Sequence, residues 1–381
     1  MKKNLYAQSH NENRSKSTDH GKRRTSFLIQ AAGFAVSLVL TGFCLTGCDK
    51  PALFNKEDDS PLTLAMKEIE AGNYNEAAAL LEAIPEGEED ERLVKRGLGM
   101  AHLEAHDYEK AKGCFEEALA LSNGILNDLD VDISYYLAVA EYKSGNVQGA
   151  IDTYTAILSM YPKEDNACYL RGKAYLSMGD KSAAMADYDR AIELAPADYD
   201  HYVRICTDLS AAGYESEGKT YIEKAMNTSD KLSDYQQGIF NYYMGDYTSA
   251  RNNLENARKD DESGEDLIIY LGRAYEKLGD LGYAISLYES YIAANPQSAG
   301  CYADLGLCRM AQADYEGALE TFEAGLATGD ETYRQILMYD QIVAYEKLLD
   351  FETAKTLCAS YVNDYPDDEK ALRENQFLST R

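Results

Sequence analysis

Two consecutive helices are predicted by one stretch of the chain, DLIIYLGRAYEKLGDLGYAISLYESYIAANP, residues 266–296. Apolar and aromatic residues recur at spacings of three and four on both sides of Gly279-Asp280, which gives each half one apolar face. Gly279 can end the first helix in a left-handed conformation, and Asp280 can cap the second. Gly272 and Ala284 are small, which allows the two helices to approach closely. The stretch is therefore expected to be a helical hairpin.

The same pattern returns along the chain. Similar segments begin at Gly145 and Gly179, each with Asp or Asn after the glycine, a small residue five positions after it and an aromatic residue four positions later. The small residue recurs nine times at separations of 32 to 39 residues, most of them 34, at Ala77, Ala111, Ala150, Ala184, Gly218, Ala250, Ala284, Ala318 and Ala354. Such a period is the signature of a repeat protein whose units pack only on their neighbours. We therefore expect nine helical hairpins.

These units resemble the tetratricopeptide repeat (TPR). The family pattern of an apolar residue, Leu-Gly, Tyr, and then Ala, an aromatic residue and Pro after the turn is met at Ile268, Leu271, Gly272, Tyr275, Ala284, Tyr288 and Pro296. Two units depart from it, with Gly218 in place of the alanine and Leu349 in place of the turn glycine. The resemblance implies an all-α fold, a right-handed superhelical α-solenoid of about nine TPR-like hairpins plus a C-terminal capping helix.

The repeat register also predicts the domain organisation. We expect a signal peptide with a long polar lead (1–47), a lipidated tether (48–59), repeats 1 and 2 (60–125), an irregular linker (126–131), repeats 3 to 9 (132–366), and a capping helix with a tail (367–381). The interval between Ala111 and Ala150 stretches to 39 residues, so a kink or a division into two sub-arrays is expected at the linker.

An apolar run without a charged residue occupies positions 26–47, directly after Lys22, Arg23 and Arg24. Basic residues before an apolar core are the layout of an export signal. Its end, Leu45-Thr46-Gly47-Cys48, resembles the lipobox of bacterial lipoproteins, which implies a lipid on Cys48. The alternative is an uncleaved transmembrane anchor, because a span needs about 20 apolar residues. Both readings predict an extracytoplasmic protein anchored to the outer face of the bacterial cytoplasmic membrane.

The charge of the chain limits its partners. Seven of the 37 basic residues and two of the 65 acidic residues precede Cys48, which leaves 30 positive and 63 negative charges from that residue onward, a net charge of −33. Such a charge opposes binding to nucleic acid, where Lys and Arg must replace counterions. We therefore expect membrane contact only through the anchor, and no nucleic-acid partner.

Catalytic and metal-binding motifs are not evident in the sequence. It has no GxSxG, Walker, dinucleotide-binding or zincin motif. Asp128, Asp130 and Asp132 alternate as in an EF-hand, but Ile133 replaces the essential turn glycine, so Asp132 is expected to cap a helix instead. His102 and His106 are one helical turn apart and take the positions of a packing tyrosine and the turn glycine. The chain is predicted not to be an enzyme, with no cofactor and no metal.

The six cysteines that follow Cys48 have no close CxxC pairing. A zinc site or a thioredoxin-like redox motif therefore has no support. Most of these cysteines fall where the repeat needs a small or apolar residue. They are expected to be buried free thiols, with a disulfide framework as the alternative.

The TPR resemblance implies that the first helices of the hairpins line a concave groove for a protein or peptide. The residues predicted to line it are Tyr135, Tyr142, Tyr169, Lys173, Tyr235, Tyr242, Arg273 and Tyr339. Tyrosine suits interfaces because it combines a large contact area with a hydroxyl group. The alternative is that these tyrosines pack between adjacent hairpins.

The carboxylate clamp of chaperone-binding TPR proteins lacks its Lys, Asn and Arg cluster here, so a peptide with apolar or aromatic anchors and some positive charge fits better. We expect a TPR lipoprotein that acts as a protein–protein interaction scaffold or assembly factor in the cell envelope. The alternatives are a binding module for a cell-wall peptide or glycan, and a self-assembling scaffold. The lack of tryptophan counts against a glycan ligand.

Overall fold

The computed structural model describes residues 60–122, 127–228, 231–260, 264–366 and 368–381. These residues form nineteen helices and no strand. The predicted signal peptide, the lipobox at Cys48 and the tether lie outside the described residues. Among the described helices, none has both the length and the apolar character needed to cross a membrane.

The helices pair into nine consecutive hairpins, as predicted. The first five are α2 (Pro61–Glu70) with α3 (Tyr74–Glu82), α4 (Glu91–Glu104) with α5 (Tyr108–Ala120), α6 (Asp128–Lys143) with α7 (Val147–Met160), α8 (Asp165–Ser177) with α9 (Lys181–Leu194), and α10 (Tyr199–Ala211) with α11 (Glu215–Met226). The other four are α12 (Asp234–Met244) with α13 (Tyr247–Lys259), α14 (Glu265–Lys277) with α15 (Leu281–Ala294), α16 (Ala299–Ala311) with α17 (Tyr315–Leu326), and α18 (Glu331–Lys347) with α19 (Phe351–Asp364). A final helix, α20 (Glu369–Leu378), packs on α19 and is the predicted capping helix.

The turn of the hairpin at residues 266–296 is built as its sequence predicts. Gly279 has a φ of +85°, a backbone conformation that glycine adopts without steric cost. Asp280 accepts a hydrogen bond from the backbone N–H of Tyr283 at 3.2 Å and so caps α15. At Gly272 an added Cβ would lie 2.2 Å from Cζ of Tyr288, so this glycine makes room for the ring on the paired helix. The absence of a side chain at Gly272 and the position of the Tyr288 ring thus depend on each other.

Three turns hold a left-handed residue that is not glycine. His106, Ala313 and Leu349 have φ values of +61°, +61° and +63°. His106 and Leu349 were predicted to occupy the turn-glycine position, and the structure confirms both placements. The packing of the hairpin therefore imposes a conformation that side chains with a Cβ adopt only at some cost.

The predicted linker extends too far along the chain, and the hairpins on its two sides pack on each other. α6 already begins at Asp128, so residues 128–131 are helical. Asn127 is the N-cap residue, in a capping box with Asp130. The predicted capping role of Asp132 is wrong, because its carboxylate pairs with Arg96 of the preceding hairpin. This ion pair joins the hairpins on the two sides of the linker, and a kink or division there stays a prediction.

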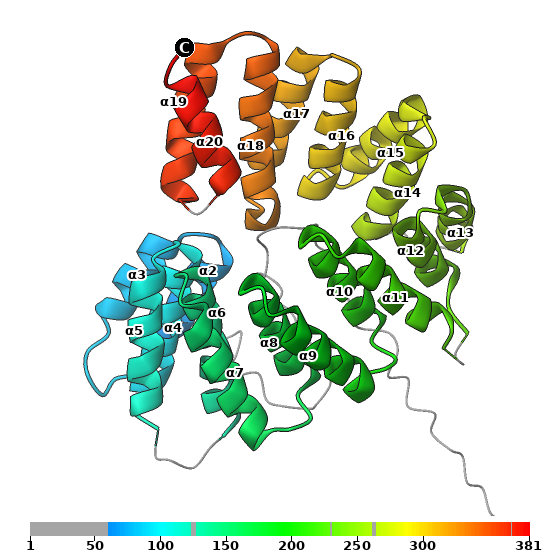
Figure 1. The fold of residues 1–381 in the computed structure, drawn as a ribbon. Helices are drawn as coiled ribbons and strands as arrows, with labels where there is room; N and C mark the ends of the chain where they lie inside the picture. Colours follow the sequence, from blue (N-terminus) through cyan, green and yellow to red (C-terminus); the bar gives the residue numbers. More distant parts are fainter. Residues whose placement is uncertain (1–59, 123–126, 229–230, 261–263, 367) are drawn as a thin grey trace, which may run out of the picture.

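The first helices of the hairpins, α2 to α18 with even numbers, are called the inner helices, and the surface that they form is called the inner face. Figure 1 shows α6, α8, α10 and α12 on the inside of a strongly curved array, with α7, α9, α11 and α13 outside. The curvature brings the first hairpins beside α18, α19 and α20 (Figure 1). The rings of His106 and Tyr365 meet there, with centroids 5.7 Å apart. The solenoid therefore closes on itself.

The cysteines agree with the expectation of free thiols. Cys114 is half-buried, and Cys168, Cys206, Cys301, Cys308 and Cys358 are buried, all of them unpaired with one another. Burial raises the pKa of Cys168 and Cys206 to about 11. Their thiols are thus protonated packing groups at neutral pH.

Candidate functional site

Ion pairs tie successive inner helices together. Arg273 on α14 and Asp304 on α16 form a two-point pair, with Nε 2.8 Å from Oδ2 and Nη2 donating to Oδ1 at 3.0 Å. Both side chains are buried. Lys173 on α8 pairs with Asp208 on α10 at 3.1 Å. The positive charges of Lys173 and Arg273 on the inner face are therefore neutralised by aspartates of the protein itself.

Half of the predicted groove residues are buried. The exposed fractions of Tyr135, Tyr169, Arg273 and Tyr339 are 2%, 3%, 8% and 9%. The prediction that these four side chains contact a partner is wrong for this conformation, because neighbouring helices cover them. The other four, Tyr142, Lys173, Tyr235 and Tyr242, are half-buried on the inner helices, and their role in binding stays a prediction.

The contacts of the buried residues show what they do instead. The ring of Tyr135 packs against Tyr154 at 6.1 Å, inside its own hairpin. Tyr169 stacks on Tyr188 at 5.8 Å and donates a hydrogen bond from its hydroxyl to Asp208 at 2.6 Å. The alternative of packing between adjacent hairpins is therefore correct for Tyr169, which bonds to Asp208 of the next hairpin, whereas the ring contact of Tyr135 lies within its own hairpin.

A second group of tyrosines is also packed between hairpins. The ring of Tyr242 on α12 lies 5.4 Å from that of Tyr270 on α14. The hydroxyls of Tyr243 and Tyr270 are 2.9 Å apart, and Thr207 on α10 donates to Tyr243 at 3.1 Å. This chain of hydroxyls joins three inner helices, so most of the tyrosine on this part of the inner face stabilises the array.

The ion-pair pattern is broken between α16 and α18. Arg273 and Leu307 occupy the same repeat position, eleven residues before the small marker residue, and Asp304 and Asp340 share the position fourteen residues before it. Asp340 therefore corresponds to Asp304, but Leu307 stands where its arginine would be. Leu307 is 41% exposed.

Because Leu307 replaces the arginine, the carboxyl group of Asp340 has no arginine at the equivalent position to pair with. Its Oδ2 is buried and has no hydrogen-bond partner among the residues that the structure describes, as is also true of Oδ2 of Asp304. The difference is that Asp304 has an ion pair with Arg273, whereas Asp340 has no ion pair among the described residues. Burial raises the pKa of this carboxyl group to about 7, and Asp304 raises it further, although Lys370 acts in the opposite direction. The inner face thus combines an exposed leucine with a carboxyl group that lacks the arginine of the equivalent pair. The sequence analysis missed Asp340, although a position-by-position comparison of the hairpins would have found it.

Another poorly neutralised carboxyl group lies at the start of α14. Burial, followed by the charges of Glu265 and Asp200, raises the pKa of Asp266 to about 7. The shift reflects a site where negative charge is costly and a neighbouring cation would be favourable. The start of α14 therefore holds a carboxyl group whose charged form is disfavoured, although Arg273 acts in the opposite direction.

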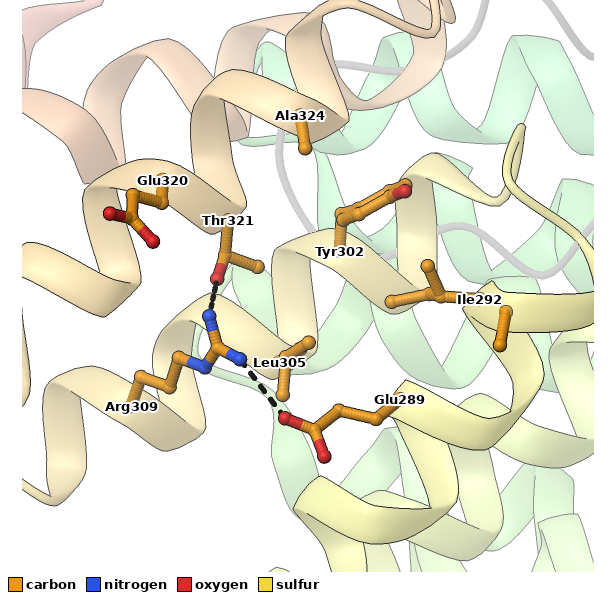
Figure 2. Close-up of a pocket in the computed structure, with 9 residues that line it drawn as sticks. Glu289, Ile292, Tyr302, Leu305, Arg309, Glu320, Thr321 and Ala324 are labelled. Atoms are coloured by element: carbon orange, nitrogen blue, oxygen red, sulfur yellow. Dashed lines mark hydrogen bonds and ion pairs between the residues drawn. The ribbon is translucent and has the colours of Figure 1, made fainter.

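A separate cavity of about 290 Å³ opens between α15, α16 and α17. Figure 2 shows Arg309 at its edge, between Thr321 and Glu289. The guanidinium donates to Oγ1 of Thr321 at 2.6 Å and to Oε1 of Glu289 at 3.0 Å. Since the hydrogen bonds of Arg309 are made within the protein, this cavity is a weaker candidate than the inner face.

Models of the tetratricopeptide repeat family match residues 96–165, 165–198, 235–299, 270–333 and 337–368. The chain therefore belongs to the tetratricopeptide repeat family. Proteins of this family mediate protein–protein interaction and scaffolding on such extended concave surfaces.

The chain is similar to parts of longer proteins. It is 27% identical to General transcription factor 3C polypeptide 3 of Homo sapiens over 40% of this chain and 17% of that protein. It is 23% identical to the Hsp70-Hsp90 organizing protein of Triticum aestivum over 49% of this chain and 39% of that protein. The matches thus span well under half the length of these relatives.

Solved structures are also similar. A tetratricopeptide repeat protein from Parabacteroides merdae is 15% identical, with a TM-score of 0.43, over 74% of this chain and 97% of that chain. YrrB, described as a TPR protein with an unusual peptide-binding site, is 18% identical, with a TM-score of 0.33, over 58% of this chain and 97% of that chain.

Proposed function

We propose that this protein is a membrane-anchored, extracytoplasmic TPR lipoprotein that recruits or assembles a partner protein in the cell envelope. The partner docks on the inner face at α16 and α18 through a segment with an apolar residue next to a lysine or arginine. The observation that carries this proposal is Asp340, whose Oδ2 is buried and which lacks the arginine that its counterpart Asp304 has, because the exposed Leu307 occupies the repeat position of that arginine.

The chemistry of the docked segment follows from these two side chains. A buried carboxylate is costly without a counter-charge and is stabilised by a cation that approaches closely. A partner's lysine or arginine would complete at Asp340 the pair that Arg273 and Asp304 already form. An apolar partner residue would remove Leu307 from water, which contributes about 25 cal/mol per Å² of buried apolar surface.

Membrane attachment is the second part of the proposal. The apolar run, the preceding basic residues and the lipobox at Cys48 support a lipid anchor on the outer face of the cytoplasmic membrane. The net charge of −33 from Cys48 onward supports a domain that meets the membrane only through this anchor and binds no nucleic acid. Because the family typically consists of scaffolds, we expect recruitment and not catalysis.

The test is site-specific photo-crosslinking in intact host cells. One variant carries a photoreactive residue at Leu307 on the inner face, and a matched variant carries it at Met160, which is 38% exposed at the end of an outer helix. We expect a stoichiometric protein adduct from position 307 only, with the crosslinked segment containing a basic residue next to an apolar one.

Three other outcomes would each contradict the docking proposal. A crosslink from position 307 to a second copy of this chain would favour the self-assembling scaffold. A crosslink to cell-wall peptide or glycan would favour the ligand-binding module. Equal adducts from positions 307 and 160 would show that the inner face at α16 is not a specific site.

A further inference from the structure

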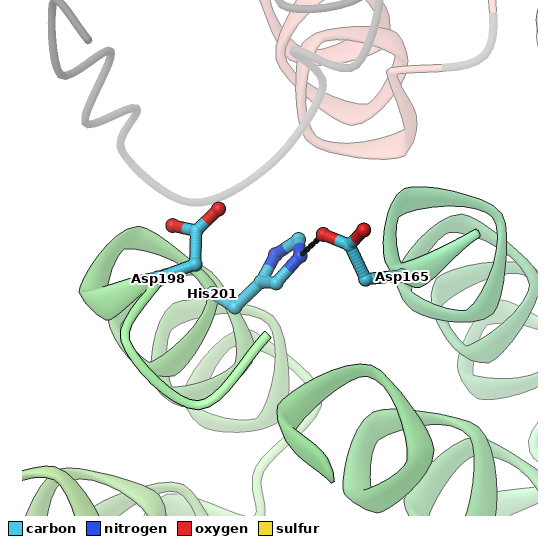
Figure 3. A group of neighbouring side chains, drawn as sticks. All are labelled: Asp165, Asp198 and His201. Atoms are coloured by element: carbon cyan, nitrogen blue, oxygen red, sulfur yellow. Dashed lines mark hydrogen bonds and ion pairs between the residues drawn. The ribbon is translucent and has the colours of Figure 1, made fainter. Parts of the chain in front are cut away.

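Two aspartates and one histidine meet where α8 and α10 begin (Figure 3). Asp165 is the first residue of α8, Asp198 is the N-cap residue of α10, and His201 lies in the first turn of α10. One carboxylate oxygen from each aspartate and one ring nitrogen all lie within 4.8 Å of one another. The three side chains are therefore within reach of a single small ion.

The imidazole of His201 is held in one orientation. It is 2% exposed, and its ring stacks on that of Tyr169 with centroids 5.6 Å apart. Nε2 lies 2.8 Å from Oδ2 of Asp165. An ionised carboxylate can only accept a hydrogen bond, so Nε2 carries the hydrogen and donates it. The other ring nitrogen, Nδ1, therefore has a lone pair in the neutral ring.

This second nitrogen makes no hydrogen bond to the described residues. Nδ1 of His201 is buried and has no hydrogen-bond partner in the part of the chain that the structure describes. A buried polar group without a partner destabilises the fold, and native proteins rarely leave one without a reason. A histidine that donates one N–H to a carboxylate and presents the other nitrogen as a lone pair has the arrangement of a metal ligand.

Asp198 offers a second ligand, because one of its carboxylate oxygens lies within 4.8 Å of a ring nitrogen of His201. Its side chain makes no capping hydrogen bond to α10, whereas Asp180 caps α9 by accepting from the backbone N–H of Ala183 at 3.0 Å. Figure 3 shows the imidazole between the two carboxylates, with Asp198 on the side away from Asp165. Side chains three residues apart at a helix start share one face, as in the acidic-x-x-His pairs of metal-binding helices.

We propose that Asp198 and Nδ1 of His201 bind a divalent first-row transition-metal ion. Asp165 orients the imidazole through Nε2–H, and water completes the coordination. Imidazole nitrogen with carboxylate oxygen suits zinc and its neighbours, whereas magnesium and calcium prefer oxygen ligands alone. The sequence analysis expected no metal, because Asp165 and His201 are 36 residues apart and meet only through the packing of two hairpins. This inference is independent of the proposed function.

Zinc titration of the full chain, purified in detergent and first stripped of metal by a chelator, tests the site. Calorimetry would measure the stoichiometry and affinity for Zn²⁺, and thermal unfolding would measure the shift in Tm. Asp198→Asn is the main variant, because asparagine is equally suited to an N-cap position and preserves the fold. Asp180→Asn is the matched control at the start of α9, and His201→Gln removes the imidazole.

The proposal expects the wild type and Asp180→Asn to bind one equivalent of Zn²⁺ that raises the Tm, with no shift caused by Mg²⁺. Asp198→Asn and His201→Gln should lose this equivalent, and Asp165→Asn should weaken binding about tenfold, the effect usual for a residue that orients a ligand. Absence of binding in the wild type would overturn the proposal. Equal zinc binding by the wild type and either Asp198→Asn or His201→Gln would also overturn it.

Discussion

The ring of His106 in the second hairpin meets the ring of Tyr365 at the end of the ninth, edge to face, with centroids 5.7 Å apart and planes inclined by 74°. Burial, followed by the charge of Lys143, lowers the pKa of His106, so its imidazole is neutral at physiological pH. The contact closes the solenoid and encloses the inner face. A partner must therefore enter from an open edge of the ring, or the ring must open.

Tyr365→Ala is expected to open this closure. An aromatic pair contributes about 0.5–1.5 kcal/mol, so its loss should reduce the ratio of closed to open forms by up to about tenfold. Small-angle X-ray scattering should detect a larger radius of gyration. Tyr161→Ala is the control, because Tyr161 occupies the same repeat position at the end of α7. An equal change in both variants, or in neither, would contradict a specific role for Tyr365.

Asp340→Asn is expected to stabilise the protein in a pH-dependent way. Burial raises the pKa of Asp340 to about 7, above its value in the unfolded chain, so between about pH 4 and pH 7 the folded state binds the extra proton. Its contribution to stability is therefore lost as the pH rises through this window. The amide should increase the free energy of unfolding by at least about 1 kcal/mol at pH 8, and by little at pH 4.5.

The control for this prediction is Asp304→Asn. Its carboxylate is paired with the buried Arg273, and removing one partner of a buried pair costs about 3–5 kcal/mol. Chemical denaturation at both pH values would measure the two variants. Stabilisation by both substitutions, or destabilisation by Asp340→Asn at pH 8, would show that Asp340 is not an uncompensated charge.

Leu349→Gly is expected to raise stability by up to about 1 kcal/mol. Leu349 has a φ of +63° and is 73% exposed, so its side chain loses little packing on removal while the left-handed backbone becomes favourable for glycine. Thermal unfolding would show a higher Tm. The reverse change, Gly279→Leu at the equivalent turn, should lower the Tm. A change in Tm of the same sign for both variants would contradict the prediction.

Gly272→Ala should destabilise the array by about 1–3 kcal/mol, the usual cost of overpacking. An added Cβ would lie 2.2 Å from Cζ of Tyr288, a ring that is fully buried and cannot move aside. Gly282→Ala on α15 is the control, because no atom lies within 4 Å of its added Cβ and alanine is the better helix former. Chemical denaturation should give opposite signs for the two substitutions, and equal effects would show that the Tyr288 contact is not close.

The hairpins could be predicted because each is specified by residues close together in sequence. Gly279 and Asp280 determine a turn and a cap, and Gly272 and Tyr288 determine a helix contact, so every unit has its own local evidence. Leu349 shows that the register tolerates a wrong residue at one position when the rest of the hairpin packs correctly.

The inner face could be predicted only in part, because exposure there depends on how neighbouring hairpins pack. Tyr135 and Tyr169 are in the repeat positions that face a groove, but both are buried, and their rings pack on Tyr154 and Tyr188 of the paired helices. Asp132 looked like a helix cap in its local context, and the guanidinium of Arg96 in another hairpin proved the stronger partner. Asp340 was missed because its significance lies in the absence of an arginine, which only a comparison between hairpins reveals.

The central claim is that the inner face binds a segment in which a cation meets Asp340 and an apolar residue meets Leu307. The most direct measurement is the affinity of peptides selected from a random library on the full chain, compared between the wild type and Asp340→Asn at pH 8. The claim predicts peptides with lysine or arginine next to an apolar residue, and affinities at least about tenfold weaker for the variant, a loss of about 1.4 kcal/mol. Selection of acidic peptides, or equal affinity for both proteins, would contradict it.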